Sequence, residues 1–197
     1  MQIHYKLKTA PATRPIASTD IVISSRTGTL GADDAAYVTE LIDGAVQRFE
    51  GWTGRALITQ TWQASIDLDY GAMPDVITLR PAPVQSVTTI TEYDEEDDDD
   101  TVDTDIYRLD AISTPARIIR RASQSWPTNV RQQGSFVIEY IAGYGAAAAV
   151  PNDIKNALRV MVADAWEHRE SKVIGASVAE IPSLAQDVVR AYRMTRV

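Results

Sequence analysis

Seven consecutive acidic residues, Asp94–Asp100, are the group in this sequence that most obviously could do chemistry. A calcium-binding loop places its acids at alternating positions and needs a glycine for its sharp turn, and this run has neither feature. Adjacent like charges repel one another and stay in water. Because strand-forming residues flank the run, we predict an exposed hairpin tip. The tip comprises Asp94, Glu95, Glu96, Asp97, Asp98, Asp99 and Asp100.

Side chains that commonly act in catalysis are scarce. The chain has no cysteine and only two histidines, His4 and His168. His168 lies in "WEHRE" near the end of a predicted helix, where a surface or subunit-contact role is expected. A hydrolase would need convergent carboxylates, but the strand-end acids Asp67, Asp69 and Glu139 follow no pattern that would bring them together. No nucleophile-elbow, zinc-protease, phosphate-loop or dinucleotide motif occurs. We therefore predict no enzymatic activity, no cofactor and no metal site.

The acidity of the chain is local, because the run Asp94–Asp100 supplies seven charges of a formal net charge of −8. A protein that binds nucleic acid through its phosphates normally carries a basic stripe. Here the basic residues form only short clusters, such as Arg120-Arg121. No stretch reaches the roughly 18 apolar residues that span a membrane, and the first residues lack the apolar core of a signal peptide. We expect a soluble protein assembled in the cytoplasm.

Two segments have the apolar spacing of long amphipathic helices. The first covers residues 33–55, with Asp33 and Asp34 at its N-terminus and Gly54 at its end, which suit the helix dipole and a helix stop. The second begins near Pro151, which fits a first helical turn. A shorter helix follows in "PSLAQDVVRAYRM". Each long helix has an apolar face that needs a partner, so we expect the two to pack together.

Between these helices the apolar pattern changes to the alternation of strands. Short turns between the stretches imply antiparallel pairing. The predicted strands lie in "ALITQTWQASIDL", "VITLR", "VQSVTTITEY", "DIYRL", "ARIIR" and "SFVIEYIAGY". The predicted fold class is α+β: a small helical bundle of two long helices and a short C-terminal helix, with an inserted antiparallel β lobe.

The expected domains are an N-terminal arm at 1–32, a helical domain at 33–55 and 150–197, and the β lobe at 56–145. Within the arm, the prolines and small polar residues of "TAPATRPIAST" favour an extended arm or a loop. The segment that follows, "STDIVISSR", is compatible with a short helix or a strand, and its β-branched residues slightly favour the strand.

For three of the tryptophans, the question is whether the side chain packs in the core or contacts another protein. Trp52 and Trp166 fall on the apolar faces of the two long helices, where core packing is expected. Trp126 stands before a proline in a loop, where it either covers the sheet or anchors an interface. The short C-terminal helix raises the same question, because a helix of this length is marginal alone in water and needs a surface to dock on. That surface belongs either to its own domain or to another protein.

In order and spacing, these elements resemble the head–tail connector (adaptor) proteins of long-tailed phages and gene transfer agents. The resemblance covers roughly residues 33–197, and none of its stretches is a catalytic motif. The matching stretches are "YVTELIDGAVQRFEGWTGRALITQTW", "LRPAPVQSVTTITEYD", "YRLDAISTPARI", "SWP", "VIEYIAGYG" and "VPNDIKNALRVMVADAWEHRES". The acidic run departs from the family, in which the corresponding hairpin is usually shorter and less acidic.

The resemblance implies a structural protein of the neck of a virion or gene transfer agent particle, assembled in the bacterial host cytoplasm. Members of the family form a homo-oligomeric ring, usually a dodecamer, beneath the portal protein. The ring joins the DNA-filled head to the stopper or tail-completion protein, and DNA passes through its lumen without sequence-specific binding. The C-terminal helix and tail engage the portal. In this chain the implied portal-docking residues are Leu184, Val188, Arg190, Tyr192, Arg193 and Arg196.

Two other interpretations stay open. The chain could be another neck component, a stopper or tail-completion protein, although those are usually smaller and mainly β. It could also be an acidic module that binds a basic protein through Asp94–Asp100. Deleting the acidic run would separate this last interpretation from a solvated tip, because binding would be lost only if the run is the site.

Overall fold

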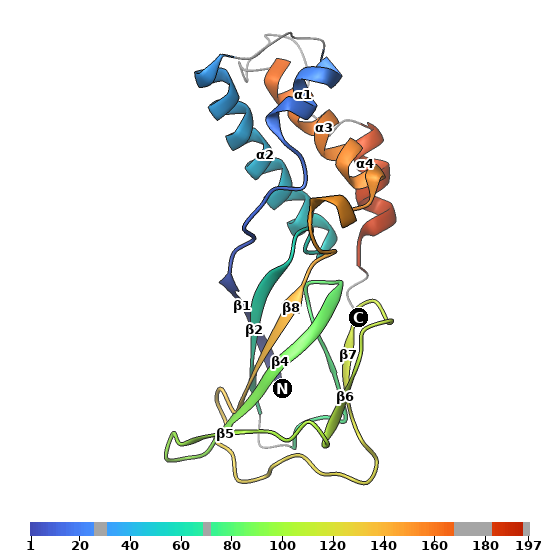
Figure 1. The fold of residues 1–197 in the computed structure, drawn as a ribbon. Helices are drawn as coiled ribbons and strands as arrows, with labels where there is room; N and C mark the ends of the chain where they lie inside the picture. The colour runs from blue at the N-terminus through green and yellow to red at the C-terminus, as the bar shows by residue number, and fades with distance from the viewer. Residues whose placement is uncertain (26–30, 69–71, 168–182, 195–197) are drawn as a thin grey trace, which may run out of the picture. The chain divides into compact units, whose positions relative to one another are not determined.

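The computed structural model describes residues 1–25, 31–68, 72–167 and 183–194, which form two compact units (Figure 1). The β unit comprises residues 1–12 and 59–144, and the helical unit comprises residues 13–58 and 145–197. The predicted α+β class, with a helical bundle and an antiparallel β lobe, is confirmed. The predicted domain boundaries stay a proposal, because a compact unit need not fold independently.

The β unit contains two antiparallel sheets in its described residues. The larger has the strand order β1-β2-β8-β4-β5 and the smaller the order β3-β7-β6. Six strands overlap the six predicted stretches, whereas β1 and β5 were not predicted. The strands are β1 (Gln2–Thr9), β2 (Gln60–Asp67), β3 (Val76–Thr78), β4 (Val84–Tyr93), β5 (Asp99–Thr101), β6 (Tyr107–Asp110), β7 (Arg117–Arg120) and β8 (Phe136–Ala142).

Alternation along β8 determines which face of the larger sheet is buried. Phe136, Ile138 and Tyr140 are buried on one face, and the register pairs the first two with Ile66 and Ala64 of β2. Side chains that lie directly opposite each other in paired strands share a face, so these residues form one apolar layer. The buried Tyr140 hydroxyl donates a hydrogen bond to the Arg80 carbonyl, and burial raises the pKa of this hydroxyl.

Trp126 packs against residues of both sheets. Its ring stacks on Tyr107 of β6 at 6.3 Å between ring centroids, and it meets Phe136 of β8 edge-on at 6.3 Å. The indole N–H donates to the Pro74 carbonyl at 3.0 Å, so its polar atom is satisfied although the residue is only 6% exposed. In the single chain, Trp126 therefore covers the sheet and is not a free interface anchor.

The helical unit packs two long helices through the faces that the sequence predicts, and Tyr37 of one lies 5.9 Å from Trp166 of the other, between ring centroids. The helix α2 (Ala32–Thr53) is capped at its C-terminus by Gly54, whose positive φ of 71° suits glycine. No helix in the described ranges is long and apolar enough to cross a membrane. The helices are α1 (Ser18–Ser25), α2 (Ala32–Thr53), the 3₁₀ helix η1 (Ala147–Ala149), α3 (Asn152–Glu167) and α4 (Ser183–Tyr192).

The slightly favoured strand at "STDIVISSR" is wrong, because Ser18–Ser25 of this segment form the helix α1. Asp20 in its first turn accepts a hydrogen bond from the Ala17 N–H at 2.9 Å and lies 3.7 Å from Arg159 of α3. Ile21 is fully buried. A local cap and tertiary packing thus outweigh the β-branched composition, which is only a weak preference.

The predicted core position of Trp52 is also wrong, since its side chain is 36% exposed. The buried stripe of α2 runs through Phe49 and continues at Thr53, whose hydroxyl donates to the Phe49 carbonyl at 2.8 Å. Consecutive residues of an α-helix point about 100° apart, so Trp52 is turned away from that stripe. Trp166, in contrast, is buried as expected.

Candidate functional site

The strand-end carboxylates are held in separate contacts. Asp67 accepts hydrogen bonds from the Gly134 N–H at 2.7 Å and from His4 at 3.1 Å, and these contacts, the Gly134 N–H first, lower its pKa. Glu139 accepts from Lys8. Asp69 and His168 lie outside the described residues. Within the described parts of the chain, no three His, Asp or Glu side chains are grouped so that they could hold a metal ion.

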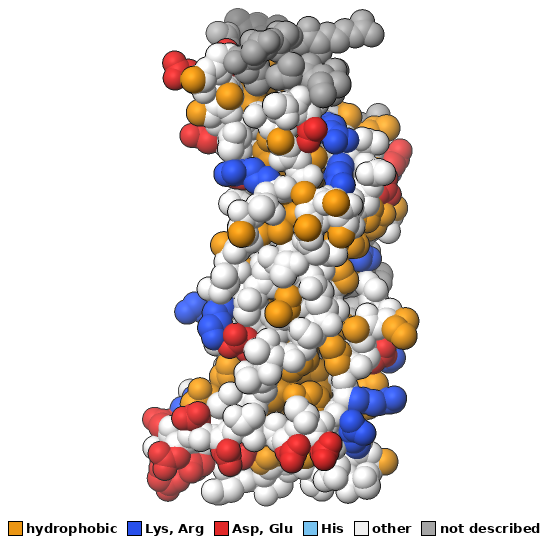
Figure 2. Space-filling model, in the orientation of Figure 1, with side chains coloured by type: hydrophobic (Ala, Val, Ile, Leu, Met, Phe, Trp, Pro, Cys, Tyr) orange, Lys and Arg blue, Asp and Glu red, His pale blue; other side chains and the backbone are white. Residues whose placement is uncertain are grey.

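The structure places the acidic run at the hairpin that joins β4 to β5. Residues 94–98 form the turn, and Asp99 and Asp100 begin β5, where they pair with Tyr93 and Glu92. Asp94 is half-buried, and the other six acids are exposed. Figure 2 shows acidic side chains gathered at the lower left of the view, where Figure 1 shows this hairpin. The run therefore forms a local, strongly negative surface on the β unit.

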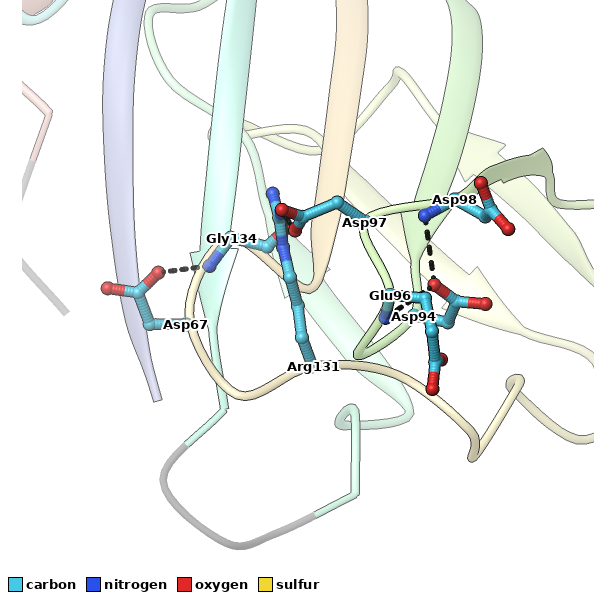
Figure 3. Close-up of polar contacts among 7 residues, drawn as sticks. All are labelled: Asp67, Asp94, Glu96, Asp97, Asp98, Arg131 and Gly134. Carbon is cyan, nitrogen blue, oxygen red and sulfur yellow. Dashed lines mark hydrogen bonds and ion pairs between the residues drawn. The ribbon is translucent and has the colours of Figure 1, made fainter.

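Asp94 gives this turn its shape (Figure 3). Its carboxylate oxygen Oδ1 accepts hydrogen bonds from the Glu96 N–H at 3.0 Å and the Asp98 N–H at 2.9 Å. Asp97 takes a positive φ of 66°, a conformation that aspartate tolerates better than most side chains. Asp94 thus acts as an internal cap, in the way that Asx turns do.

Arg131 anchors the turn from a loop far along the chain. Its guanidinium pairs with Asp97 and lies over the Tyr93 ring at 4.5 Å from the centroid. Its backbone N–H donates to the Tyr93 carbonyl at 2.9 Å. Sequence analysis missed this residue, because nothing in "NVRQQG" indicates a partner 34 positions away.

Replacing Asp94 by alanine is expected to loosen the hairpin by about 1 kcal/mol, because two backbone N–H groups lose their acceptor. The loosening should appear as faster hydrogen exchange at the Val102 amide, which closes the hairpin by donating to the Ile90 carbonyl at 2.8 Å. Asp94→Asn keeps an acceptor oxygen and is the matched control. Equal exchange rates in Asp94→Ala and the wild type would contradict the proposed role.

Glu92 of β4, beside the acidic turn, has a carboxylate that is poorly exposed to water. It is half-buried, and its oxygen Oε2 is buried without a hydrogen-bond partner in the described structure. Burial raises its pKa, and the neighbouring charges of Asp100 and Asp94 raise it further. A raised pKa in the folded state means that folding disfavours the ionised form. Glu92 is therefore a source of instability at neutral pH.

The Glu92→Gln variant is expected to be more stable than the wild type at pH 7. Because the folded pKa of Glu92 is raised, its penalty is absent below the unfolded value of about 4.3 and grows as the pH rises through the folded value. The urea midpoints of Glu92→Gln and the wild type should therefore agree at pH 4 and differ at pH 7. Glu95→Gln removes the same charge from the exposed turn and should give a smaller gain. A gain that is equal at both pH values would refute the explanation.

The basic cluster Arg120-Arg121 is engaged within the β unit. Arg120 pairs with Asp75 at 2.7 Å and donates to the Gln124 carbonyl. Arg121 donates to the Tyr107 carbonyl at 3.2 Å. These guanidinium groups hold loops of the β unit in place.

The C-terminal helix α4 docks on its own unit through part of its surface. The Tyr192 hydroxyl donates to Asp153 of α3 at 2.8 Å, and its carbonyl accepts from Arg55 at 2.7 Å. Ala185 and Met194 are buried, and the Met194 N–H donates to the Thr53 carbonyl at 3.0 Å. Tyr192 therefore has a structural role, and these contacts hold α4 in place within the single chain.

Other residues of α4, and Arg193 just after it, are exposed to solvent. Leu184 is 52% exposed, and Arg190 and Arg193 are exposed, whereas Val188 is half-buried. Arg190 lies 3.8 Å from Asp187 in a loose surface pair. Arg196 lies outside the described residues. Among the implied docking residues that the structure describes, Leu184, Arg190 and Arg193 are thus the exposed ones.

Comparisons with known proteins indicate one kind of assembly. No family model matches the sequence, and a search of curated proteins finds no significant match. The structure is similar to a chain in the neck of an empty gene transfer agent (GTA) particle with C6 symmetry, at a TM-score of 0.77 and 25% identity over 98% of this chain and 97% of that one. It is also similar to a chain in the virion of a native GTA particle, with a TM-score of 0.79 and 24% identity over 98% and 96% of the two chains.

A third neighbour is a chain in the neck of a native GTA particle with C12 symmetry, with a TM-score of 0.68 and 23% identity over 97% of both chains. The similarity covers the helical and β units together and leaves almost no residue of either chain unmatched. These neighbours confirm the resemblance to neck proteins of phages and gene transfer agents.

Proposed function

We propose that this chain is a head–tail adaptor: a structural subunit of a ring beneath the portal protein, which joins the DNA-filled head to the stopper or tail. The observation that carries the proposal is the similarity, over 98% of the chain, to a chain in a GTA particle neck. A match of this extent includes both units. It therefore supports a role for the whole chain as one neck subunit, and not merely a shared domain.

The proposed ring has twelve copies. The structurally similar chains come from GTA particle necks with C6 and C12 symmetry. A twelvefold ring satisfies both symmetries. Such a ring needs a heterologous contact, in which one surface of each copy meets a different surface of the next. The ring would be located in the neck of a virion or GTA particle, after assembly in the bacterial host cytoplasm.

The charge of the chain is consistent with a passive conduit for DNA. Each cation that grips a phosphate strengthens binding and would slow a passing duplex. The chain has a net charge of −8, and Arg120 and Arg121 are engaged in contacts within the β unit. We therefore propose that DNA crosses the ring without sequence-specific contacts, and that the protein performs no catalysis.

The experiment that tests this function mixes the full-length chain with its cognate portal ring and weighs the complex by native mass spectrometry. We expect the portal to gain twelve copies of the 21.6-kDa chain. Binding to the tail-completion protein but not to the portal would favour the alternative neck component. Binding to neither protein would overturn the neck role.

A further inference from the structure

Among the residues that the structure describes, strand β1 is an edge of the larger sheet and has no partner strand on its outer side. It pairs with β2 on one side only, as the end of the order β1-β2-β8-β4-β5. Seven of its eight residues are exposed, including Tyr5 and Leu7, the latter at 39%. An edge strand of this length offers unpaired backbone groups along its free side. The edge is therefore a surface on which another chain can dock.

The charged side chains of β1 itself are all basic. His4, Lys6 and Lys8 alternate along β1, and no acid lies within Gln2–Thr9. His4 and Lys8 have partners in their own chain, Asp67 and Glu139. Among the described ion pairs and hydrogen bonds, none includes Lys6, and its side chain is exposed.

The opposite edge of the same sheet is acidic. Figure 3 shows β1, in lilac at the left, separated by β2 and β8 from β4 and the acidic turn. The hydrogen-bonded rows that begin at Ile3 and His4 on β1 end at Asp100 and Thr101 on β5. The two edges of the sheet thus lie four strand spacings apart in these rows, or about 19 Å. The row of Lys6 runs further along the strands and ends at Thr89 on β4.

We propose that, in the ring, strand β1 of each copy docks against the acidic β4–β5 hairpin of the next copy. This inference rests on the proposed ring and names its subunit contact. Opposite charges at the two edges favour a head-to-tail contact, whereas two β1 edges, or two acidic hairpins, would repel one another. The charge pattern therefore favours a heterologous contact, which can close into a ring. It disfavours a two-fold dimer, in which identical edges would meet.

Lysines on an edge strand also have a simpler use, because they discourage aggregation through the free edge. That use alone predicts a β1 edge that stays in water in the assembled neck. Docking is favoured because acidic residues are clustered at the opposite edge of the sheet. The two explanations differ in whether Lys6 lies next to a neighbouring hairpin once the ring has formed.

Cross-linking tests this contact directly, because the chain has no cysteine of its own. A variant carrying both Lys6→Cys and Asp99→Cys is assembled on the cognate portal and oxidised with oxidised glutathione. The two positions are too far apart for a disulfide within one chain, so we expect a ladder of covalent multimers. Lys6→Cys with Gln47→Cys, on the exposed face of α2, is the control and should give no ladder.

A complex with the portal that yields no ladder above the control would overturn the edge contact and leave the adaptor function standing. Absence of any ring would overturn both. Charge exchange gives a second readout: Lys6→Glu and Asp99→Lys should each raise the concentration needed for assembly about tenfold, and the double variant should recover it in part. Single and double variants that assemble like the wild type would also contradict the contact.

Discussion

Replacing Trp126 by alanine is expected to lower the free energy of unfolding of the β unit by about 3–5 kcal/mol. The indole stacks on Tyr107 and meets Phe136 edge-on, so its removal leaves a cavity between side chains of the two sheets. It also removes the hydrogen bond to the Pro74 carbonyl. Urea denaturation monitored by circular dichroism in the β-sheet region measures the change.

Two matched variants make this prediction specific. Trp126→Phe keeps an aromatic ring but loses the N–H donor, and it should cost about 1–2 kcal/mol. Trp52→Ala removes an indole that is 36% exposed, so it should cost less than Trp126→Ala. If Trp52→Ala proves the more damaging of the two, the assignment of Trp126 to the core is wrong.

Replacing Leu184 by aspartate is expected to weaken binding to the portal by roughly 30-fold or more, the effect of losing an interface residue worth about 2 kcal/mol. Leu184 is a large apolar side chain on the solvent-facing part of α4, at 52% exposure. Because it contributes little to the core, the melting temperature should hardly change. Pull-down by immobilised portal, with the melting curve of the same sample, measures both quantities.

Tyr192→Phe is the complementary variant. It removes the hydrogen bond to Asp153 and should lower stability by about 1 kcal/mol without weakening the portal contact. Deleting residues 183–197 would not separate the two effects, because it also removes buried Ala185 and Met194. Normal portal binding by Leu184→Asp would show that α4 is not the docking element.

The periodicity of the sequence was sufficient for the elements that bury a continuous face. The long helices α2 and α3 and the strands β2, β4 and β8 follow their apolar spacing. It could not reveal β1, whose residues are exposed on both faces. It also could not reveal β5, which consists of two aspartates and a threonine and is held by pairing to β4. The order β2-β8-β4 joins strands far apart in sequence, and local pattern carries no such information.

The candidate surfaces could likewise be predicted only in part from the sequence. Composition alone located the acidic turn, but it did not indicate that Arg131 and Asp94 hold that turn in shape. For α4, the basic and apolar residues were visible, but only packing distinguishes docked Tyr192 from exposed Leu184. Trp52 was misplaced because helical spacing cannot decide between neighbouring positions in the last turn of α2.

The most direct test of the adaptor role is a cryo-electron microscopy reconstruction of the neck of particles assembled with this chain. We expect a twelvefold ring of the chain directly beneath the portal. We also expect particles made without the chain to be heads that lack tails. Density for the chain elsewhere in the particle, or tailed particles that form without it, would contradict the adaptor role.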